Sequence, residues 1–360
     1  MKPRVLFISG READYMRNRV ILAALRMFGE VTVLTGAGSG IVGRTASGLA
    51  RYLARQPDHD VCFAGFFGQP IALGLSVLQR KPIVLDAFVS AYDTLCEDRR
   101  RFRPDSPPGR LAYWLDQRSC RVSSQVITDT SAGTRYFQRT FSLDPNRFST
   151  VYVGCDETIF YPRVQGKGTG CRPCEVFYYG AFLPLHGAEV IIQAAALLGR
   201  RSDIHWTIGG DGPAFARVRQ MVSDLGVTNV EMPGWIPVER LADHIADADI
   251  CLGGHFSTIP KAGRVISTKT FQFLAMRKAV IVGDNEATRE LLTSGQHALA
   301  VPMGDPAALA QAVETLADDP AQRHHLSEGG YELFRQKLTT AAIAQHLAGI
   351  VEGAQSSSRP

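Results

Sequence analysis

The chain has no long apolar run. No window approaches the ~20 apolar residues that a helix needs to cross a bilayer, and the run Val5–Ile8 is too short for a signal-peptide core. Charge of one sign is also scarce, because 39 basic residues face 35 acidic ones and the net charge is only +4. A nucleic-acid binder usually has a concentrated basic face. These absences predict a cytoplasmic protein without a nucleic-acid partner, or one attached at most to a membrane surface.

Cysteine and metal-binding patterns are sparse as well. The seven cysteines are scattered and odd in number, which is typical of reduced thiols. Cys171 and Cys174 form one C-x-x-C pair, and no second pair follows at zinc spacing. The pair Asp247 and Asp249 precedes a predicted strand instead of following one, and no G-x-G-x-x-G opens the chain. We therefore expect no metal and no cofactor, and a nicotinamide dehydrogenase is disfavoured.

The sequence does contain a repeated alternation of strands and helices. Short apolar runs predict buried parallel strands at 4–8, 31–34, 61–64, 83–85 and 125–128, with helices at 18–28 and 109–122. The alternation then restarts, with strands at 175–179, 205–208, 230–232, 250–252 and 279–282 and helices at 188–198, 214–225, 238–246 and 270–276. This pattern predicts an α/β protein of two Rossmann-like, doubly wound domains facing across a cleft.

The predicted domain boundaries follow from this restart. An N-terminal domain is expected over 1–165 and a C-terminal domain over 173–335, joined by a Gly- and Lys-rich linker at 161–172. A last helix at 336–352 has no domain of its own, and we expect it to pack back on the N-terminal domain. Ligands of open α/β sheets bind beyond the carboxyl ends of the strands, so the site is expected there.

Several short motifs stand in a fixed order. The second half contains Tyr179-Gly180, then Ile208-Gly-Gly-Asp-Gly-Pro213, then Gly234-Trp235-Ile-Pro237, then Lys269-Thr-Phe-Gln-Phe-Leu-Ala275. In this order they resemble the nucleotide-sugar domain of the GT4 family of retaining glycosyltransferases, which have the GT-B fold. The segment 153–162 resembles the domain junction of that family. The resemblance implies an EC 2.4 enzyme that moves a sugar, with retention, from a nucleotide-diphosphate donor to a hydroxyl or amine acceptor.

The expected donor site lies in the second half. Its predicted residues are Gly180, His186, Gly187, Gly210, Asp211, Trp235, Lys261, Arg264, Lys269 and Gln272. Amides at a helix N-terminus suit a diphosphate, and we expect His186 to add charge beside them. Lys261, Arg264 and Lys269 are expected to hold the pyrophosphate in place of a metal. The alternatives are a plain strand–helix turn and a solvated loop with ordinary charges.

Two positions depart from the family pattern. Where the family usually has two glutamates eight residues apart, this chain has Arg264 and Gln272. Either the donor bears extra negative charge, or its sugar is held differently, or the loop has another register. Phe88 stands where many members have a histidine near the reacting carbon. These departures favour, as the alternative function, a catalytically inactive partner that binds a nucleotide sugar.

The first half is expected to bind the acceptor and assist catalysis. The predicted acceptor residues are Arg11, Tyr15, Arg17 and Tyr92. Catalytic roles are predicted for Asp86 and Asp93 towards the acceptor hydroxyl, and for Lys269 and Arg264 towards the leaving group. A helix cap with solvated arginines is the alternative near Arg11 and Arg17. The acceptor class stays open among glycans, lipid-linked molecules and small metabolites, as do the donor base and sugar.

A compact basic run occupies residues 99–103, beside three prolines. Such a run is most often a solvated loop. It also suits an anionic acceptor or anionic lipid headgroups, so peripheral contact with a membrane is a second expectation.

Overall fold

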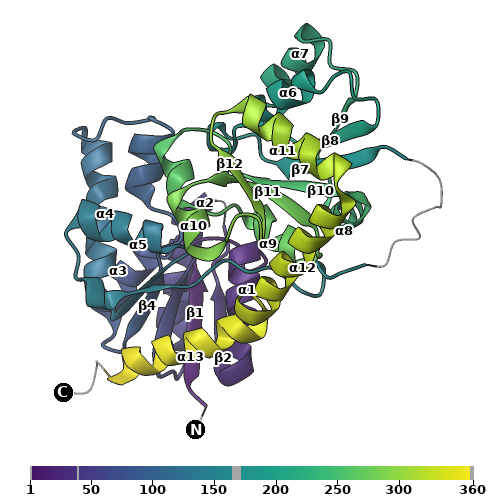
Figure 1. Ribbon diagram of the computed structural model, residues 1–360. Helices are drawn as coiled ribbons and strands as arrows, with labels where there is room; N and C mark the ends of the chain where they lie inside the picture. Colours follow the sequence, from purple (N-terminus) through teal and green to yellow (C-terminus); the bar gives the residue numbers. More distant parts are fainter. Residues whose placement is uncertain (1, 39, 164–171, 357–360) are drawn as a thin grey trace. The chain divides into compact units, whose positions relative to one another are not determined.

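The computed structural model describes residues 2–38, 40–163 and 172–356 (Figure 1). The chain divides into two compact units: unit 1 comprises Met1–Gly154 with Leu338–Pro360, and unit 2 comprises Cys155–Lys337. Each unit contains, among the described residues, one six-stranded sheet whose neighbouring strands are all parallel. The predicted fold class of two Rossmann-like domains is therefore confirmed.

Unit 1 has the strand order β2-β1-β3-β4-β5-β6. Its elements are β1 (Arg4–Ser9), α1 (Met16–Phe28), β2 (Glu30–Thr35), α2 (Gly40–Arg55), β3 (Val61–Gly65), α3 (Gln69–Leu78), β4 (Ile83–Asp86), the π-helix η1 (Asp93–Asp98), α4 (Pro107–Val122), β5 (Gln125–Thr128), α5 (Ser131–Phe141), the 3-10 turn η2 (Pro145–Arg147), β6 (Phe148–Thr150) and α13 (Thr340–Ser356). Central strands are buried on both faces, and residues Val5 to Ile8 of β1 are at most 1% exposed. Such burial explains their unbroken apolar sequence.

Unit 2 has the strand order β12-β11-β10-β7-β8-β9. Its elements are β7 (Cys174–Gly180), the 3-10 turn η3 (Pro184–His186), α6 (Ala188–Leu197), β8 (Ile204–Gly210), α7 (Phe215–Asp224), β9 (Val230–Gly234), α8 (Val238–Asp247), β10 (Ile250–Gly254), the 3-10 turn η4 (Pro260–Arg264), α9 (Thr268–Ala275), β11 (Ala279–Asp284), α10 (Glu286–Leu291), β12 (Leu299–Pro302), α11 (Pro306–Asp318) and α12 (Pro320–Lys337). Strands β10, β7 and β8 are neighbours, so their carboxyl ends lie side by side.

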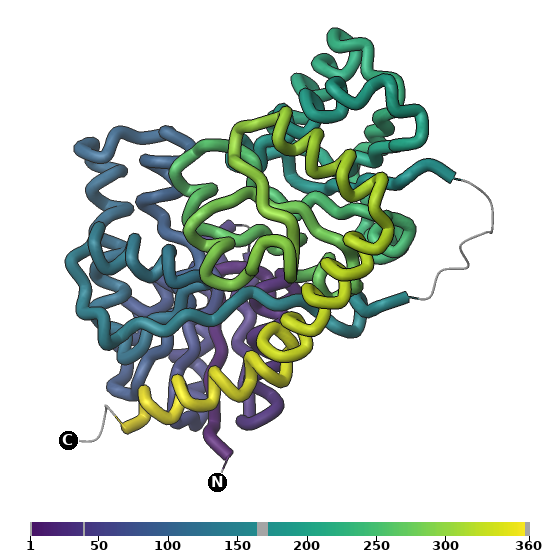
Figure 2. The backbone as a smooth tube through the Cα atoms, in the orientation of Figure 1, coloured from purple at the N-terminus to yellow at the C-terminus, as the bar shows by residue number. Residues whose placement is uncertain are grey.

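The chain returns to unit 1 at its end. Helix α13 lies along α1, and Figure 2 shows this yellow segment beside the purple start of the chain. Ile343, Leu347 and Val351 of α13 pack with Val20 and Leu25 of α1 in one buried cluster. The helix therefore completes the core of unit 1. Most of the predicted linker, residues 164–171, lies outside the described residues, and so does Cys171 of the C-x-x-C pair.

Among the described residues, no helix is both long enough and apolar enough to cross a bilayer.

Candidate functional site

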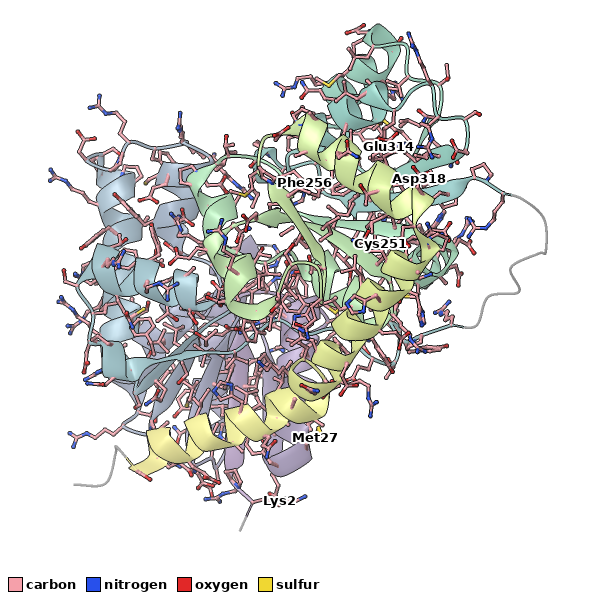
Figure 3. All side chains as sticks on the ribbon, in the orientation of Figure 1. Lys2, Met27, Cys251, Phe256, Glu314 and Asp318 are labelled. Atoms are coloured by element: carbon pink, nitrogen blue, oxygen red, sulfur yellow. The ribbon has the colours of Figure 1, made fainter. Side chains whose placement is uncertain are left out.

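The turn between β7 and α6, residues 181–187, is fixed by the loops that follow the two neighbouring strands. On one side the amide of Ala214 donates to Phe182 O at 3.2 Å, and on the other the amide of Phe256 donates to His186 O at 3.1 Å. Ser257 Oγ also donates to Leu185 O at 2.8 Å. Three separate strand ends therefore form one rigid group of backbone at the carboxyl edge of the sheet. Figure 3 labels Cys251 on β10 and Phe256 beyond its end.

Two glycines, one that ends β8 and one just beyond it, allow this close approach. Gly210 and Gly212 have positive φ angles of 122° and 145°. A Cβ atom at Gly210 would overlap the carbonyl oxygen of Gly180, and one at Gly212 would overlap that of Ala181. Asp211, between them, accepts a hydrogen bond from the amide of Gly212 at 2.7 Å. The Gly-Gly-Asp-Gly motif therefore exists because backbone must pass against backbone here.

Gly187 allows a similar close approach of backbone to backbone at the start of α6. It has φ 70°, and a Cβ atom there would overlap the backbone of Ser257. Because it is the N-cap of α6, the first amides of that helix lack side-chain partners from the cap residue. Amides at a helix N-terminus, together with the helix dipole, favour an anion. The arrangement thus suits a phosphate group in front of α6.

Lys269 brings a cation to the same edge. It lies in the first turn of α9 and is 4% exposed. Its Nζ donates to Ser267 Oγ at 2.9 Å and lies 4.9 Å from the centre of the Tyr178 ring. Within the described part of the chain, no carboxylate forms an ion pair with it. Burial without a counter-ion lowers the pKa of Lys269 to about 7.

Two histidines stack beside this lysine. The rings of His186 and His255 lie 5.3 Å apart at 22°. Each has a buried Nδ1 atom that has no hydrogen-bond partner among the described residues. Burial, reinforced by the Lys269 charge, lowers the pKa of His255 to about 3 and that of His186 further still. Burial therefore favours a neutral imidazole at His186, which can offer a polar contact in place of the expected charge.

His255 was missed by sequence reasoning. Its only signal is a polar side chain directly after the buried strand β10, in Cys251-Leu-Gly-Gly-His255. Polar residues at the carboxyl ends of parallel strands are candidates for ligand contact.

Gln272 has a fixed orientation. It is 3% exposed on α9, and the hydroxyl of Tyr179 donates to its Oε1 atom. Because that hydroxyl already occupies the carbonyl oxygen, the amide nitrogen is the group that Gln272 offers as a donor. A glutamate would have presented only acceptors.

The other predicted donor residues lie around this group. Lys261 and Arg264 are half-buried in η4, which contacts η3. Trp235 follows β9 and is 71% exposed. The structure thus gathers Gly180, His186, Gly187, Gly210, Asp211 and Lys269 at one edge of the unit 2 sheet, with Trp235 on the β9 side.

In unit 1 the structure corrects two predictions. Arg17 and Asp86 are both fully buried, and Nε and Nη2 of Arg17 each donate to Asp86 at 3.1 Å. Arg17 Nη1 also donates to Val151 O at 2.8 Å and Tyr152 O at 3.0 Å. A buried carboxylate already engaged by a bidentate arginine is not available as a base. Arg17 as an acceptor contact and Asp86 as a catalytic group are therefore wrong, because each neutralises the other inside the core.

The remaining predicted acceptor residues, Arg11, Tyr15 and Tyr92, lie in two different parts of unit 1. Arg11 lies 5.2 Å over the ring of Tyr15, which packs against Phe66 at 4.7 Å beyond the ends of β1 and β3. Tyr92 instead packs against Tyr113 at 5.5 Å in the core cluster under α4. Arg11 and Tyr15 therefore belong together at the carboxyl edge.

Asp93 and Phe88 follow β4 at the same edge. Asp93 is 5% exposed at the start of η1, so its carboxylate is largely withdrawn from solvent. Phe88 lies under Arg17, 5.4 Å from its guanidinium, and packs against Phe66 at 5.0 Å. The position of the family histidine is thus filled by an apolar contact that covers the Arg17–Asp86 pair.

A buried aspartate fixes the loop after β4. Asp116 on α4 is fully buried and accepts hydrogen bonds from Ser90 Oγ at 2.7 Å, the amide of Tyr92 at 2.8 Å and Gln69 Nε2 at 3.2 Å. Desolvation raises the pKa of Asp116 to about 6. Sequence reasoning missed this residue, although an aspartate on the apolar face of a helix is the signal that marks it.

The described residues include cysteines and other possible metal ligands. Among the described residues, no group of three or more His, Cys, Asp or Glu side chains has an arrangement suited to a metal ion. Burial raises the pKa of Cys62, Cys155 and Cys251, which marks these thiols as structural.

Part of the chain matches a known protein family. Residues 173–319 match the family of glycosyl transferases group 1. The chain is similar to the alpha-D-kanosaminyltransferase of Streptomyces kanamyceticus, with 25% identity over 67% of this chain and 63% of the relative. It is also similar to the lipopolysaccharide core biosynthesis glycosyltransferase LpsD of Rhizobium meliloti, with 30% identity over 46% of this chain and 45% of the relative. The chain thus spans less than two thirds of the length of these relatives.

Solved structures show the same fold. HepE from Anabaena in complex with UDP and glucose superposes with a TM-score of 0.73 at 15% identity, over 98% of this chain and 100% of that one. Sucrose-phosphate synthase from Thermosynechococcus elongatus superposes with a TM-score of 0.77 at 14% identity, over 99% and 100%. At such identities the likeness establishes the GT-B fold alone.

Proposed function

We propose that this chain, of which residues 173–319 match the group 1 glycosyl transferases, transfers a sugar from a nucleotide-diphosphate donor to a hydroxyl or amine acceptor. The observation that supports this most strongly is the meeting of three strand-end loops around Lys269. Backbone amides before α6, a buried lysine and two neutral histidines form a polar group, and no carboxylate of the described residues pairs with Lys269. Such a group is suited to bind an anionic part of the substrate.

The diphosphate is held by amides and by Lys269. A dianion close to Nζ stabilises the ammonium form, so donor binding raises the pKa of Lys269 and fixes its charge. The unpartnered Nδ1 atoms of His186 and His255 add two polar contacts at the same edge. In this proposal, Arg264 and Lys261 on η4 approach from the other side. Positive charge placed where the leaving group develops negative charge replaces a metal ion.

The chemical step proceeds with retention in this proposal. The bond between the anomeric carbon and the diphosphate oxygen breaks, and its electron pair goes to the departing phosphate. The acceptor oxygen or nitrogen bonds to the anomeric carbon on the same face, and its proton passes to a phosphate oxygen. Asp86 has no part in this step, because Arg17 occupies its carboxylate. Arg11 and Tyr15 are proposed to contact the acceptor, and Gln272 to donate to a donor hydroxyl.

The proposal assigns the protein to the cytoplasm, where nucleotide sugars are used without export. The assay below is designed to identify the donor base, the donor sugar and the acceptor, which is sought among glycans, lipid-linked molecules and small metabolites.

A turnover assay tests the proposal. The full chain is incubated with a panel of UDP-, GDP- and ADP-sugars and acceptors of the three classes, and ³¹P NMR follows release of the nucleoside diphosphate. We expect one donor to yield the diphosphate and a glycosylated acceptor with the donor's anomeric configuration. Lys269→Met should abolish release, whereas Arg219→Gln, an exposed cation on α7, should leave it unchanged. Binding without release under all acceptors would instead indicate an inactive donor-binding partner.

A further inference from the structure

Helix α4 has an outward face of unusual composition. At 100° per residue, positions 110, 111, 114, 118 and 121 fall on one side of the helix. They are Arg110, Leu111, Trp114, Arg118 and Arg121, and all five are exposed. The buried positions, among them Ala112, Asp116 and Cys120, occupy the opposite side. This face therefore combines three arginines with two large apolar side chains and has no acidic residue.

The basic run, residues 99–103, precedes α4 and packs beside the buried side of its first turn. The carbonyl oxygen of Arg103 packs against the first turn of α4, so close to Gly109 that a Cβ atom there would overlap it. Between residues 99 and 121 the sequence has seven arginines, and its two acidic residues are Asp105 and the buried Asp116. Within the described part of the chain, no carboxylate pairs with Arg99, Arg110 or Arg118. We call the basic run 99–103 and the exposed side chains of α4, which are Arg110, Leu111, Trp114, Arg118 and Arg121, the α4 surface.

The apolar members of the α4 surface are well exposed. Leu111 is 63% exposed and Trp114 is 51% exposed, one turn apart. Single exposed apolar residues are ordinary on soluble proteins. Here, however, tryptophan and leucine stand among arginines, and this pairing is typical of helices that lie at a membrane interface. Arginines bind lipid phosphates while the apolar side chains enter the headgroup region.

The N-terminal part of the α4 surface lies towards the edge where an acceptor is expected. Strand β4 ends at Asp86, and the chain then passes through residues 87–106 to the start of α4. The first turns of α4 therefore lie towards the carboxyl edge of the unit 1 sheet, the edge that carries Arg11 and Tyr15. Figure 1 shows α4 beside α3 in unit 1.

We propose that the α4 surface docks unit 1 onto a bilayer rich in anionic lipids, which makes a lipid-linked molecule the acceptor class. The inference rests on the proposed function for its acceptor part only. Charge complementarity supplies the attraction, because each basic residue near an anionic surface strengthens binding about fivefold. The attraction is screened by salt, since the Debye length falls from about 10 Å at 0.1 M to about 3 Å at 1 M.

Vesicle flotation of the full chain tests this proposal. Phosphatidylcholine vesicles are compared with vesicles in which about a third of the lipid is phosphatidylglycerol. We expect flotation with the anionic vesicles alone, and release at high salt. The double variant Arg110→Gln/Arg118→Gln should lower vesicle affinity about 25-fold. Leu111→Ser/Trp114→Ser should lower it about tenfold, because less apolar surface is buried.

Matched controls lie elsewhere on the surface. Leu197→Ser removes a leucine that is 61% exposed on α6, and Arg26→Gln/Arg219→Gln removes two exposed cations from α1 and α7. Neither control should change flotation by more than about twofold. If the protein fails to float with anionic vesicles at low salt, or if the α4 variants float like the controls, the proposal is overturned.

The nucleoside diphosphate affinity of each variant is measured in parallel. Retention of that affinity by the α4 variants separates a failure of docking from a failure of the proposed function.

Discussion

Lys269→Met should make unit 2 more stable while it removes donor binding. In the folded protein Lys269 is 4% exposed, and burial lowers its pKa from 10.5 to about 7. Keeping a lysine there at pH 7 costs the folded state about 4 kcal/mol relative to the unfolded chain. Methionine keeps most of the apolar stem and removes the charge.

One favourable interaction offsets part of this cost. The hydrogen bond to Ser267 is worth about 1 kcal/mol, whereas the attraction of the ammonium to the Tyr178 ring acts on the charged form and is already contained in the pKa. The net gain for Lys269→Met is therefore about 3 kcal/mol at pH 7. Because the unfolded lysine binds its proton more tightly, wild-type stability rises between pH 7 and 10.5. The advantage of the variant should accordingly shrink as the pH is raised through that window.

Urea unfolding followed by Trp206 fluorescence measures this difference. Trp206 is fully buried in unit 2, whereas Trp114 and Trp235 are exposed, so the change in emission reports mainly on unit 2. Titration calorimetry with nucleoside diphosphates measures binding of the same two proteins. A variant that is less stable than the wild type at pH 7, or that binds diphosphates with wild-type affinity, would refute the reasoning.

Three further predictions concern the glycine turn, the buried aspartate and the returning helix. Gly212→Ala should weaken diphosphate binding at least about tenfold by titration calorimetry, because its Cβ overlaps Ala181 O, whereas Gly349→Ala, with open space around it, should bind normally. Because the folded state binds the proton of Asp116 more tightly, with a pKa of about 6, the unfolding free energy of unit 1 should fall by about 3 kcal/mol as the pH rises from about 4 through 6. Asp116→Asn should abolish that difference in denaturant titrations, and an unchanged pH slope would contradict the assignment. Leu347→Ala on α13 should lower the unfolding free energy of unit 1 by about 2–5 kcal/mol, and a smaller loss would mean that α13 contributes little to that core.

The sequence predicted most strands of both units, because buried parallel strands are short apolar runs. Helices α2, α3 and α5 of unit 1 were not predicted. Helix α2 contains Gly40, Gly43 and Gly48, and glycine is a poor helix former. Its interior glycine Gly48 lies close to β1, because a Cβ atom there would be only 3.1 Å from Cγ2 of Ile8. Tertiary contact therefore overrides local preference there.

The donor residues were predictable only as a set of positions. Motif order placed Gly210, His186 and Lys269 in one site, and the structure brings them to one edge. The protonation states of His186 and Lys269 depend on how deeply each side chain is buried, and burial cannot be read from the sequence alone. Likewise the pairing of Arg17 with Asp86 joins residues 69 positions apart, so two separate polar candidates were in fact one buried ion pair.

Hydrogen exchange with and without nucleoside diphosphates tests the central claim most directly. The account predicts that one of UDP, GDP and ADP slows amide exchange in residues 181–187, 210–214 and 253–269, and that Lys269→Met removes this protection. If every diphosphate leaves these three segments unprotected, or protects only segments of unit 1, the strand-end loops around Lys269 do not form a donor site.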